Sequence, residues 1–393
     1  MKIGILEPSL LMSNRYSNRV FAPKDLFLHL TDELIKKGNE VYVFTTSDIK
    51  TTAHLMSGNK ELENQEFLSV RDGLKNSDVV NALTMIRNHY EYEVDLISRA
   101  FYYSNSNNFD ILHSQSNVFT HYFVKFSKIP VIFTLHDPVF PQNSLECSIL
   151  KMFASHNYIA ISKKQAEMYK KIMNINPVAV IHHGIKLDYF NFSQDSENYI
   201  SMLGRYIPEK GFEDGITISI KQNVQLKIAS SPNYQKTDYY LRKIKPFLKK
   251  DSNISELSFL NSNQRNIFFM NSKIMLMPIK LEEPFGLVMI EAMACGTPVV
   301  AYARGSVPEV INDGETGFIV NSSEVDKRGD WIVKKTGIEG LCEAVEKIYS
   351  MPEEQYKQMR KNCRAHVEKN FTVERMVDEY EKIYQQVIEN NKK

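Results

Sequence analysis

Short apolar runs alternate with amphipathic stretches along the chain. The first run, KIGILEP, has the composition of a strand, and residues 24–38 follow it with apolar side chains such as Phe27, Leu30 and Leu34 spaced by three and four residues. That spacing is typical of an amphipathic helix. The next run, EVYVFTTSD, again predicts a strand, and strand–helix–strand order indicates the start of a parallel α/β sheet.

The alternation pauses once, at the polar stretch 186–198, and then restarts. The later strand-like runs are NFDILHSQS, IPVIFTLHDP, YIAIS and VAVIHHGI before the pause, and YISMLG, VQLKIASS, SELSFLNS, KIMLMPIK, TPVVAYA and TGFIV after it. This pattern predicts two doubly wound α/β domains of similar size. We expect an N-terminal domain over residues 1–184, a C-terminal domain over 185–370 and a charged C-terminal helix over 371–393.

Ligands of open α/β sheets bind outside the carboxyl ends of the strands. Residues that directly follow predicted strands are therefore the first candidates for chemistry. His136, Arg205, Lys210 and Glu283 all occupy such positions. With two such domains in one chain, these residues are expected to face a cleft.

Composition and charge exclude several classes of protein. The chain has 393 residues and a net charge of +1, so no overall field attracts it to nucleic acid. The four cysteines show no metal-site spacing, which indicates reduced structural thiols. No apolar run reaches the length of a membrane span, and the first residues do not resemble a signal peptide. The basic run 241–251 is compatible with a solvated helix face or with a membrane or phosphate surface.

In the segment KLEEPFGLVMIEAMACGTPVV, one carboxylate, Glu283, stands just before a very apolar helix-like stretch, and another, Glu291, stands in the middle of it. Glu291 is the one polar side chain of the expected helix 287–294, and a buried unpaired carboxylate is costly. As a structural residue, Glu291 would accept a hydrogen bond from a backbone N–H or pair with a cation. As a site residue, it would bind ligand hydroxyls. Glu283 stands in the loop before this helix, where a strand-end residue faces the ligand. The backbone N–H groups of Phe285, Gly286 and Leu287 would form an anion site.

Two cations and a histidine complete the candidate site. Arg205 and Lys210 lie in the short loop of LGRYIPEKG and suit a diphosphate, although a solvated surface pair fits the same pattern. His136 in TLHDP stands at a strand end, and a structural role is the alternative for it. His182 and His183 have no third metal ligand at a suitable spacing, and no Asp-x-Asp pair occurs in the chain. No metal site is therefore predicted, and cations and helix N–H groups would neutralise any bound diphosphate.

These motifs together resemble the retaining glycosyltransferases of family 4. EPFGLVMIEAMACGTPVVA with RGSVPEVINDGETGFIV is similar to the glutamate–seven–glutamate signature, MLGRYIPEKGFED to the phosphate-binding loop, VIHHGIKLDYF to the interdomain segment, and KKGNEVYVFTTSD to the second N-terminal strand. The resemblance covers most of the chain and is most specific in the C-terminal half. It implies the GT-B fold, with two Rossmann-like domains facing across a cleft and the last helix crossing back to the N-terminal domain.

The resemblance also implies roles for individual residues. Arg205 and Lys210 would bind the donor diphosphate. Glu283 would approach the donor sugar, Glu291 the ribose hydroxyls, and His136 the sugar from the N-terminal domain. The expected activity is transfer of a hexosyl group from a nucleoside-diphosphate sugar, UDP- or GDP-linked, to an acceptor hydroxyl. No cofactor is expected.

The resemblance implies the donor and acceptor, whereas the net charge, the reduced thiols and the first residues predict that nucleic acid is not a partner and that the location is cytoplasmic. The expected partners are the nucleotide-sugar donor and an acceptor that is a small molecule, a glycan or a lipid-linked sugar, with no nucleic acid. A monomer or homodimer in the cytoplasm, with peripheral contact at the inner membrane face as an option, is expected. The acceptor and the linkage formed are not encoded in these motifs.

Two stretches depart from the family pattern. Where a glycine pair is frequent after the first strand, this chain has SNRYSNRVFAPKDL, in which Arg15, Arg19 or Lys24 would compensate or merely decorate the surface. Ser230 and Ser231 stand where a glycine is common. The alternatives to a transferase are a GT-B sugar-nucleotide 2-epimerase, a nonenzymatic sugar-nucleotide-binding subunit and a dinucleotide dehydrogenase. A dehydrogenase is disfavoured because this chain has no G-x-G-x-x-G after its first strand.

Overall fold

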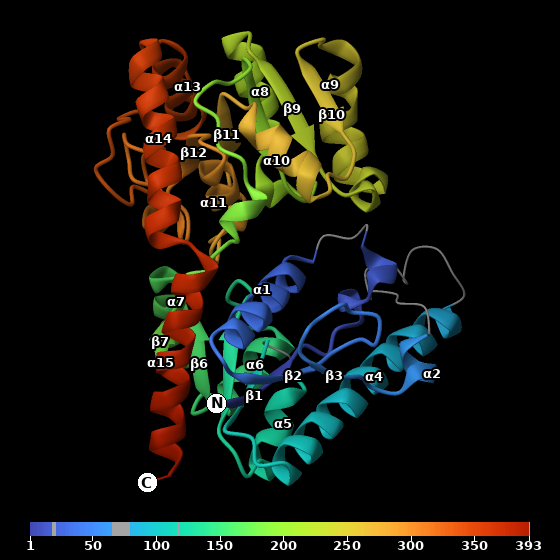
Figure 1. Cartoon of the computed structure of the whole chain (residues 1–393). Helices are drawn as coiled ribbons and strands as arrows, with labels where there is room; N and C mark the ends of the chain where they lie inside the picture. The colour runs from blue at the N-terminus through green and yellow to red at the C-terminus, as the bar shows by residue number, and fades with distance from the viewer. Residues whose placement is uncertain (18–20, 65–78, 116–117, 393) are drawn as a thin grey trace. The chain divides into compact units, whose positions relative to one another are not determined.

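The computed structural model describes residues 1–17, 21–64, 79–115 and 118–392, and the chain folds into two compact units (Figure 1). Unit 1 comprises Met1–Ile161, Ala166–Ile181 and Met376–Lys393. Unit 2 comprises Ser162–Gln165 and His182–Arg375. The chain therefore passes briefly into unit 2 over Ser162–Gln165, and it crosses again close to 181 and close to 375. The last two positions lie a few residues from 184 and 370, the boundaries that the sequence suggested.

Unit 1 is built on a parallel sheet with strand order β3-β2-β1-β4-β5-β6-β7 in the described residues. The strands are β1 (Lys2–Leu6), β2 (Glu40–Phe44), β3 (His54–Met56), β4 (Ile111–Ser114), β5 (Val131–Leu135), β6 (Asn157–Ala160) and β7 (Ala179–Val180). The order reverses between β1 and β4, and their carboxyl ends form the expected ligand-binding edge. This edge includes the positions that follow β4 and β5.

Helices cover both faces of this sheet, as expected for a doubly wound domain. They are α1 (Ala22–Lys36), α2 (Lys60–Glu63), α4 (Val79–Ser106), α5 (Thr120–Phe123), α6 (Leu145–Met152), α7 (Lys163–Met173) and, within unit 1 from Met376 onward, α15 (Val373–Asn391). Apolar residues of α4, such as Tyr92 and Leu96, pack on Leu112 and Phe133 of the sheet, and all four are fully buried. Burial of this kind is the main favourable contribution to folding.

Unit 2 repeats the plan with strand order β10-β9-β8-β11-β12-β13 among its described strands. The strands are β8 (Tyr199–Leu203), β9 (Gln225–Ala229), β10 (Ile254–Leu257), β11 (Ile274–Met277), β12 (Val299–Tyr302) and β13 (Gly317–Val320). Its helices are α8 (Phe212–Gln222), α9 (Lys245–Lys250), α10 (Ser262–Met270), α11 (Leu287–Ala294), α12 (Val307–Val310), α13 (Gly337–Tyr349) and α14 (Glu353–Asn370). Central strands β8 and β11 are neighbours, so their carboxyl ends lie side by side.

The two predicted α/β domains are thus confirmed, with two local differences. The run VAVIHHGI forms a strand over Ala179–Val180 and leaves the sheet before Gly184. It does so because the chain there turns to pair with the segment before α15, where Ile185 bridges to Thr372. The polar stretch 186–198 is not a free linker, since Arg364 donates to the Phe190 carbonyl and the buried Arg360 to the Ser193 carbonyl. No helix in the described part of the chain has the length and hydrophobicity needed to cross a bilayer.

Candidate functional site

Lys210 and Glu283 meet at the carboxyl ends of neighbouring strands. Lys210 ends a 3-10 turn, Pro208–Lys210, in the loop after β8, and Glu283 lies in the loop after β11. The Lys210 Nζ atom is 2.7 Å from Glu283 Oε2, and the side chains are 20% and 12% exposed. Lys280 joins the same two loops, because its backbone N–H donates to the Glu209 carbonyl. The sequence-predicted cation and carboxylate are therefore partners in the described structure.

Arg205 lies on the same loop as Lys210, and its side chain is exposed. A guanidinium there is available to a ligand, whereas Lys210 is held in place by a carboxylate. Since Arg presents a planar fork and Lys a point charge, the two cations suit different oxygens of one polyanion.

The start of α11 provides the third part of the site. Gly286 precedes the helix with φ of +78°, a left-handed conformation that favours glycine. The chain therefore turns sharply after Glu283, and the first N–H groups of the helix, at Leu287 and beyond, are directed along its axis. Phe285 itself is buried and packs edge-on against His183, with ring centroids 5.2 Å apart. These contacts fix the backbone of the predicted anion site.

Glu291 is buried within α11, and its Oε2 atom lies 3.5 Å from Nε of Arg265 in α10. The apolar helix thus holds its carboxylate against a cation, which corresponds to the structural interpretation offered from the sequence. Because the Arg265 side chain is 24% exposed, a ligand hydroxyl could still approach the pair. The ribose contact that the family resemblance implies for Glu291 stays a prediction.

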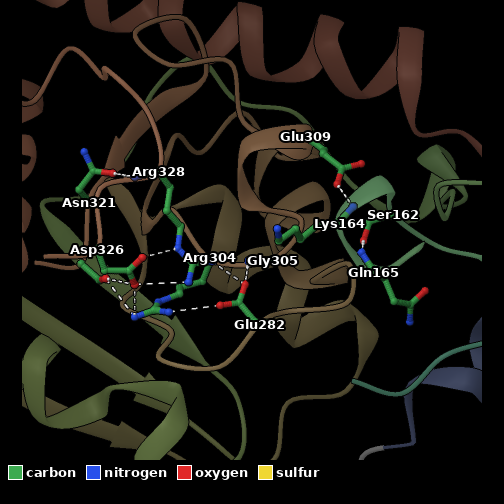
Figure 2. Close-up of polar contacts among 11 residues, drawn as sticks. Ser162, Lys164, Gln165, Glu282, Arg304, Gly305, Glu309, Asn321, Asp326 and Arg328 are labelled. Atoms are coloured by element: carbon green, nitrogen blue, oxygen red, sulfur yellow. Dashed lines mark hydrogen bonds and ion pairs between the residues drawn. The ribbon is translucent and has the colours of Figure 1, made fainter. Parts of the chain in front are cut away.

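Glu282, the neighbour of Glu283, anchors the loop from the other side (Figure 2). Its carboxylate accepts hydrogen bonds from Arg304 Nη1 at 3.2 Å, from Arg328 Nη1 at 2.7 Å and from the backbone N–H of Gly305 at 2.8 Å. Asp326 pairs with both arginines. Burial by itself raises the pKa of Glu282, but the hydrogen bonds from Arg328 and Gly305 outweigh it and hold the pKa below its usual value.

Backbone contacts continue this bracing into the Glu283 loop. Ser306 donates its N–H to the Glu283 carbonyl at 2.9 Å and its hydroxyl to the Phe285 carbonyl at 2.8 Å. Gly305 has φ of +56°, and a Cβ atom on it would lie 2.2 Å from the Glu283 carbonyl oxygen. Sequence reasoning missed this role of Glu282, Arg304 and Gly305. The signal was present in the doubled glutamate of EEP and in the RGS of RGSVPEV.

We expect Glu282→Ala to lower the free energy of unfolding of unit 2 by about 1–3 kcal/mol, because it removes one of the two carboxylates that two partly buried guanidinium groups share and leaves Asp326 as the other. Urea unfolding followed by fluorescence of Trp331, the one tryptophan, measures this change. Trp331 donates to Asn321, which also accepts from the Arg328 backbone. Asp330→Ala is the matched control, since its side chain is 93% exposed and its ion pair contributes little. Equal midpoints for the two variants would contradict the bracing role.

A second carboxylate, Glu309 in α12, holds the segments at the unit boundary. It accepts from the backbone N–H groups of Lys163 and Lys164 at 2.8 Å each and from His182 Nε2 at 2.9 Å. Figure 2 shows Glu309 against the start of α7, apart from the Glu282 cluster. Arg375 in turn donates to the His182 carbonyl. Glu309 therefore ties His182 to the start of α7.

His136 lies in unit 1, after β5, and its Nε2 atom is 2.6 Å from Gln115 Oε1. Burial lowers the pKa of His136 to about 4, so the ring is neutral near pH 7. Glu7, directly after β1, is 4% exposed, and burial raises its pKa to about 8. The carboxyl edge of this sheet therefore carries a histidine and a carboxylic acid that are both uncharged at neutral pH.

The loop that lacks the family's glycine pair is tied to its own unit. Arg15 donates to the backbone carbonyls of Glu63 and Asn64 at the end of α2, and Lys24 donates to Asn14 Oδ1 at 2.9 Å. Arg19 lies outside the described residues. Arg15 and Lys24 are thus engaged in holding this loop together.

Two family models match consecutive parts of the chain. The model described as Glycosyltransferase Family 4 matches residues 26–189, and the model described as Glycosyl transferases group 1 matches residues 188–366. The first match contains His136 and the second contains Arg205, Lys210, Glu283 and Glu291. The predicted site residues of unit 1 and of unit 2 therefore lie within the matched segments.

Curated relatives share segments of the chain. The N-acetyl-alpha-D-glucosaminyl L-malate synthase of Bacillus anthracis is 32% identical over 146 residues, which is 37% of this chain and 32% of that protein. The D-inositol 3-phosphate glycosyltransferase of Mycobacterium sp. (strain JLS) is 29% identical over 194 residues, 44% of this chain and 42% of that protein. The matches thus span less than half the length of these relatives.

Solved structures match almost the whole chain. Sucrose-phosphate synthase from Thermosynechococcus elongatus superposes with a TM-score of 0.76 at 16% identity, covering 99% of this chain and 100% of that one. Anabaena Alr3699/HepE, solved in complex with UDP, gives 0.67 at 14% identity, with 98% and 100% covered. At these identities the likeness shows the fold, which is the GT-B fold implied by the sequence motifs. With two family models that together span residues 26–366, the chain belongs to the group 1 glycosyltransferases of family 4.

Proposed function

We propose that this protein moves a hexosyl group from a nucleoside-diphosphate sugar to an acceptor hydroxyl, with retention of the anomeric configuration and without a metal ion. The observation that carries the proposal is the Lys210–Glu283 pair at the carboxyl ends of β8 and β11. Exposed Arg205 shares the Lys210 loop, and α11 begins directly after the Glu283 loop. Cations and helix N–H groups suit a diphosphate, and a fixed carboxylate suits a sugar with developing positive charge.

The proposed chemistry needs few groups. The bond between the anomeric carbon and the diphosphate oxygen breaks, and its electron pair stays on the diphosphate. The acceptor oxygen bonds to the anomeric carbon on the same face, and its proton passes to the leaving phosphate oxygen. Arg205, Lys210 and the α11 N–H groups stabilise the charge on the leaving group, which is electrostatic stabilisation of the transition state. Glu283 orients the sugar and stabilises positive charge at the anomeric carbon, and is not a nucleophile.

Roles for the remaining predicted residues belong to the same proposal. Glu291 and its partner Arg265 would meet the ribose hydroxyls, and His136 would contribute from unit 1. Solved neighbours were determined with UDP, UDP-glucose or ADP, which supports a nucleotide-linked donor here, and we propose a UDP or GDP linkage. Two relatives are named for L-malate and for D-inositol 3-phosphate, which supports an acceptor hydroxyl on a small molecule, although a glycan or lipid-linked sugar fits the same chemistry.

A thermal-shift panel of UDP-, GDP- and ADP-sugars tests the donor. A ligand that binds the folded state stabilises it by mass action, by about 2.7 kcal/mol at a concentration of 100 Kd. We expect a UDP- or GDP-sugar to raise the melting temperature by several degrees, and we expect the shift to persist in a metal chelator. A panel without any shift, or a shift abolished by the chelator, would contradict the proposed donor site.

Product analysis with the donor that binds separates the alternatives. A transferase releases nucleoside diphosphate and forms a new glycoside that depends on the acceptor. Formation of a 2-epimer or of free nucleoside diphosphate without any acceptor would indicate an epimerase. A donor that binds but stays unchanged with varied acceptors would indicate a nonenzymatic binding subunit.

A further inference from the structure

Polar side chains occur two residues apart on neighbouring strands of unit 1. His113 lies in β4 with Gln115 directly after the strand, and Thr134 lies in β5 with His136 directly after it. Residues two apart in a strand lie on the same face of the sheet. Since β4 and β5 are paired in parallel, the four side chains gather on one face near its carboxyl edge.

The last helix covers that face with two tyrosines. Tyr380 and Tyr384 of α15 are four residues apart, so they share one side of the helix. The Tyr384 hydroxyl is 2.6 Å from His113 Nδ1, and the Tyr380 hydroxyl is 2.9 Å from the Thr134 hydroxyl. Both tyrosines are 2% exposed or less. The helix thus joins a buried hydrogen-bonded network that leads to His136.

The donors and acceptors of this network can be assigned from chemistry. His113 is fully buried and its pKa is lowered to about 3, so the ring is neutral and has one N–H and one lone pair. Its Nε2 atom is 2.8 Å from the Thr134 hydroxyl, which can donate or accept, and 3.2 Å from the Gln115 Nε2 amine, which can only donate and lies farther, 3.5 Å, from Nδ1. His113 Nε2 is therefore the acceptor, and Nδ1–H donates to the Tyr384 hydroxyl.

Gln115 also determines which nitrogen of the His136 ring carries the hydrogen. With its amine directed at His113, Gln115 presents Oε1 to His136, and a carbonyl oxygen can only accept. His136 Nε2, 2.6 Å away, must then carry the hydrogen. The lone pair of the neutral His136 ring is on Nδ1.

We propose that Gln115 is a positioning residue that holds His136 in the Nε2–H tautomer, with the C-terminal helix orienting Gln115 through Tyr384 and His113. This rests on the proposed function insofar as His136 takes part in transfer. The C-terminal helix thereby acts on His136 within unit 1 through side-chain contacts.

Nitrogen-15 NMR of the histidine rings tests the proposal directly and needs no activity. In the full chain we expect Nε2–H for His136 and Nδ1–H for His113. Gln115→Met, which keeps the length and removes the acceptor, should give a mixture of His136 tautomers. Gln115→Glu, which keeps an acceptor, should retain Nε2–H. Nδ1–H for His136 in the unaltered protein, or an unchanged tautomer in Gln115→Met, would overturn the proposal.

Tyr384→Phe tests the contribution of the last helix. It removes the acceptor of the His113 Nδ1–H group, so His113 should lose its single tautomer. Tyr102→Phe is the control, since Tyr102 is 76% exposed on α4, and its histidine signals should match the unaltered protein. An unchanged His113 in Tyr384→Phe would remove the helix from the proposal.

Steady-state kinetics with the donor that binds then tests whether the orientation of His136 by Gln115 affects sugar transfer. For Gln115→Met we expect kcat to fall by about 10- to 100-fold, the scale of a misplaced group, with KM for the donor within about twofold. For Gln115→Glu we expect activity near that of the unaltered protein and an acidic limb of the pH profile displaced to higher pH, because a carboxylate raises the pKa of His136. Full activity of Gln115→Met would overturn the positioning role. A protein that shows the expected tautomers and no transfer would instead refute the proposed function alone.

Discussion

Replacing Lys210 with alanine is expected to lower kcat by about 10²- to 10³-fold, roughly 3–4 kcal/mol of transition-state stabilisation. The ammonium group is 2.7 Å from Glu283 and only 20% exposed, so it is held in a fixed position before any ligand binds. A charge placed in advance needs no reorganisation as negative charge builds on the departing diphosphate. Steady-state release of nucleoside diphosphate from the donor identified by thermal shift measures the effect.

Two further variants sharpen this test. Arg205→Ala should weaken donor binding as well as turnover, because its exposed side chain has to be ordered by the ligand. Lys334→Ala is the control for loss of one positive charge, since Lys334 pairs with exposed Asp330. Normal turnover in Lys210→Ala would exclude the proposed role of the cation, whereas equal losses in Lys210→Ala and Lys334→Ala would point to a general effect of charge.

The architecture could be predicted from the sequence because short apolar runs mark the strands and apolar residues spaced by three and four mark the helices. Apolar runs such as KIMLMPIK became strands buried along their whole length, and the restart after residue 198 marked a second sheet. Strand-end positions also placed Lys210 and Glu283 correctly at one edge, because parallel neighbours end together. The order of the strands alone is enough to place these two residues at one edge of the sheet.

Side-chain contacts between residues far apart in the sequence could not be predicted in the same way. Glu282 meets Arg328 46 residues later, and His113 meets Tyr384 271 residues later. No local spacing rule connects such positions, so a charge in a loop looks the same whether it is solvated or braced. Glu291 illustrates the reverse case, in which burial was evident from the helix pattern and the identity of its partner, Arg265, was not.

Contacts on both sides of the Glu283 loop fix the orientation of the Glu283 carboxylate. Glu282 is fixed by two arginines, and Ser306 holds the Glu283 carbonyl, so the backbone on both sides of the Glu283 side chain is constrained. Constraint of this kind is what electrostatic preorganisation requires of a site. The network therefore connects a stability feature of unit 2 to the chemistry proposed for Glu283.

Glu283→Gln is expected to lower kcat by about 10²-fold with little change in KM for the donor, because the amide keeps the shape and removes the charge that acts in the transition state. The measurement is again acceptor-dependent release of nucleoside diphosphate. Unaltered kcat in Glu283→Gln would contradict its role at the anomeric carbon. Donor-induced thermal shifts, compared between the variant and the unaltered protein, show whether ground-state binding is preserved.

The double variant Lys210→Ala with Glu283→Gln gives the strongest test of the pair. Groups that act as a unit lose activity non-additively, so the combined loss should be well below the product of the two single losses. Each single change leaves the other charge without its partner at 2.7 Å, and the second change then costs less. A loss equal to the product would mean that the Lys210–Glu283 contact does not exist in the working enzyme and that the two residues act on the donor independently.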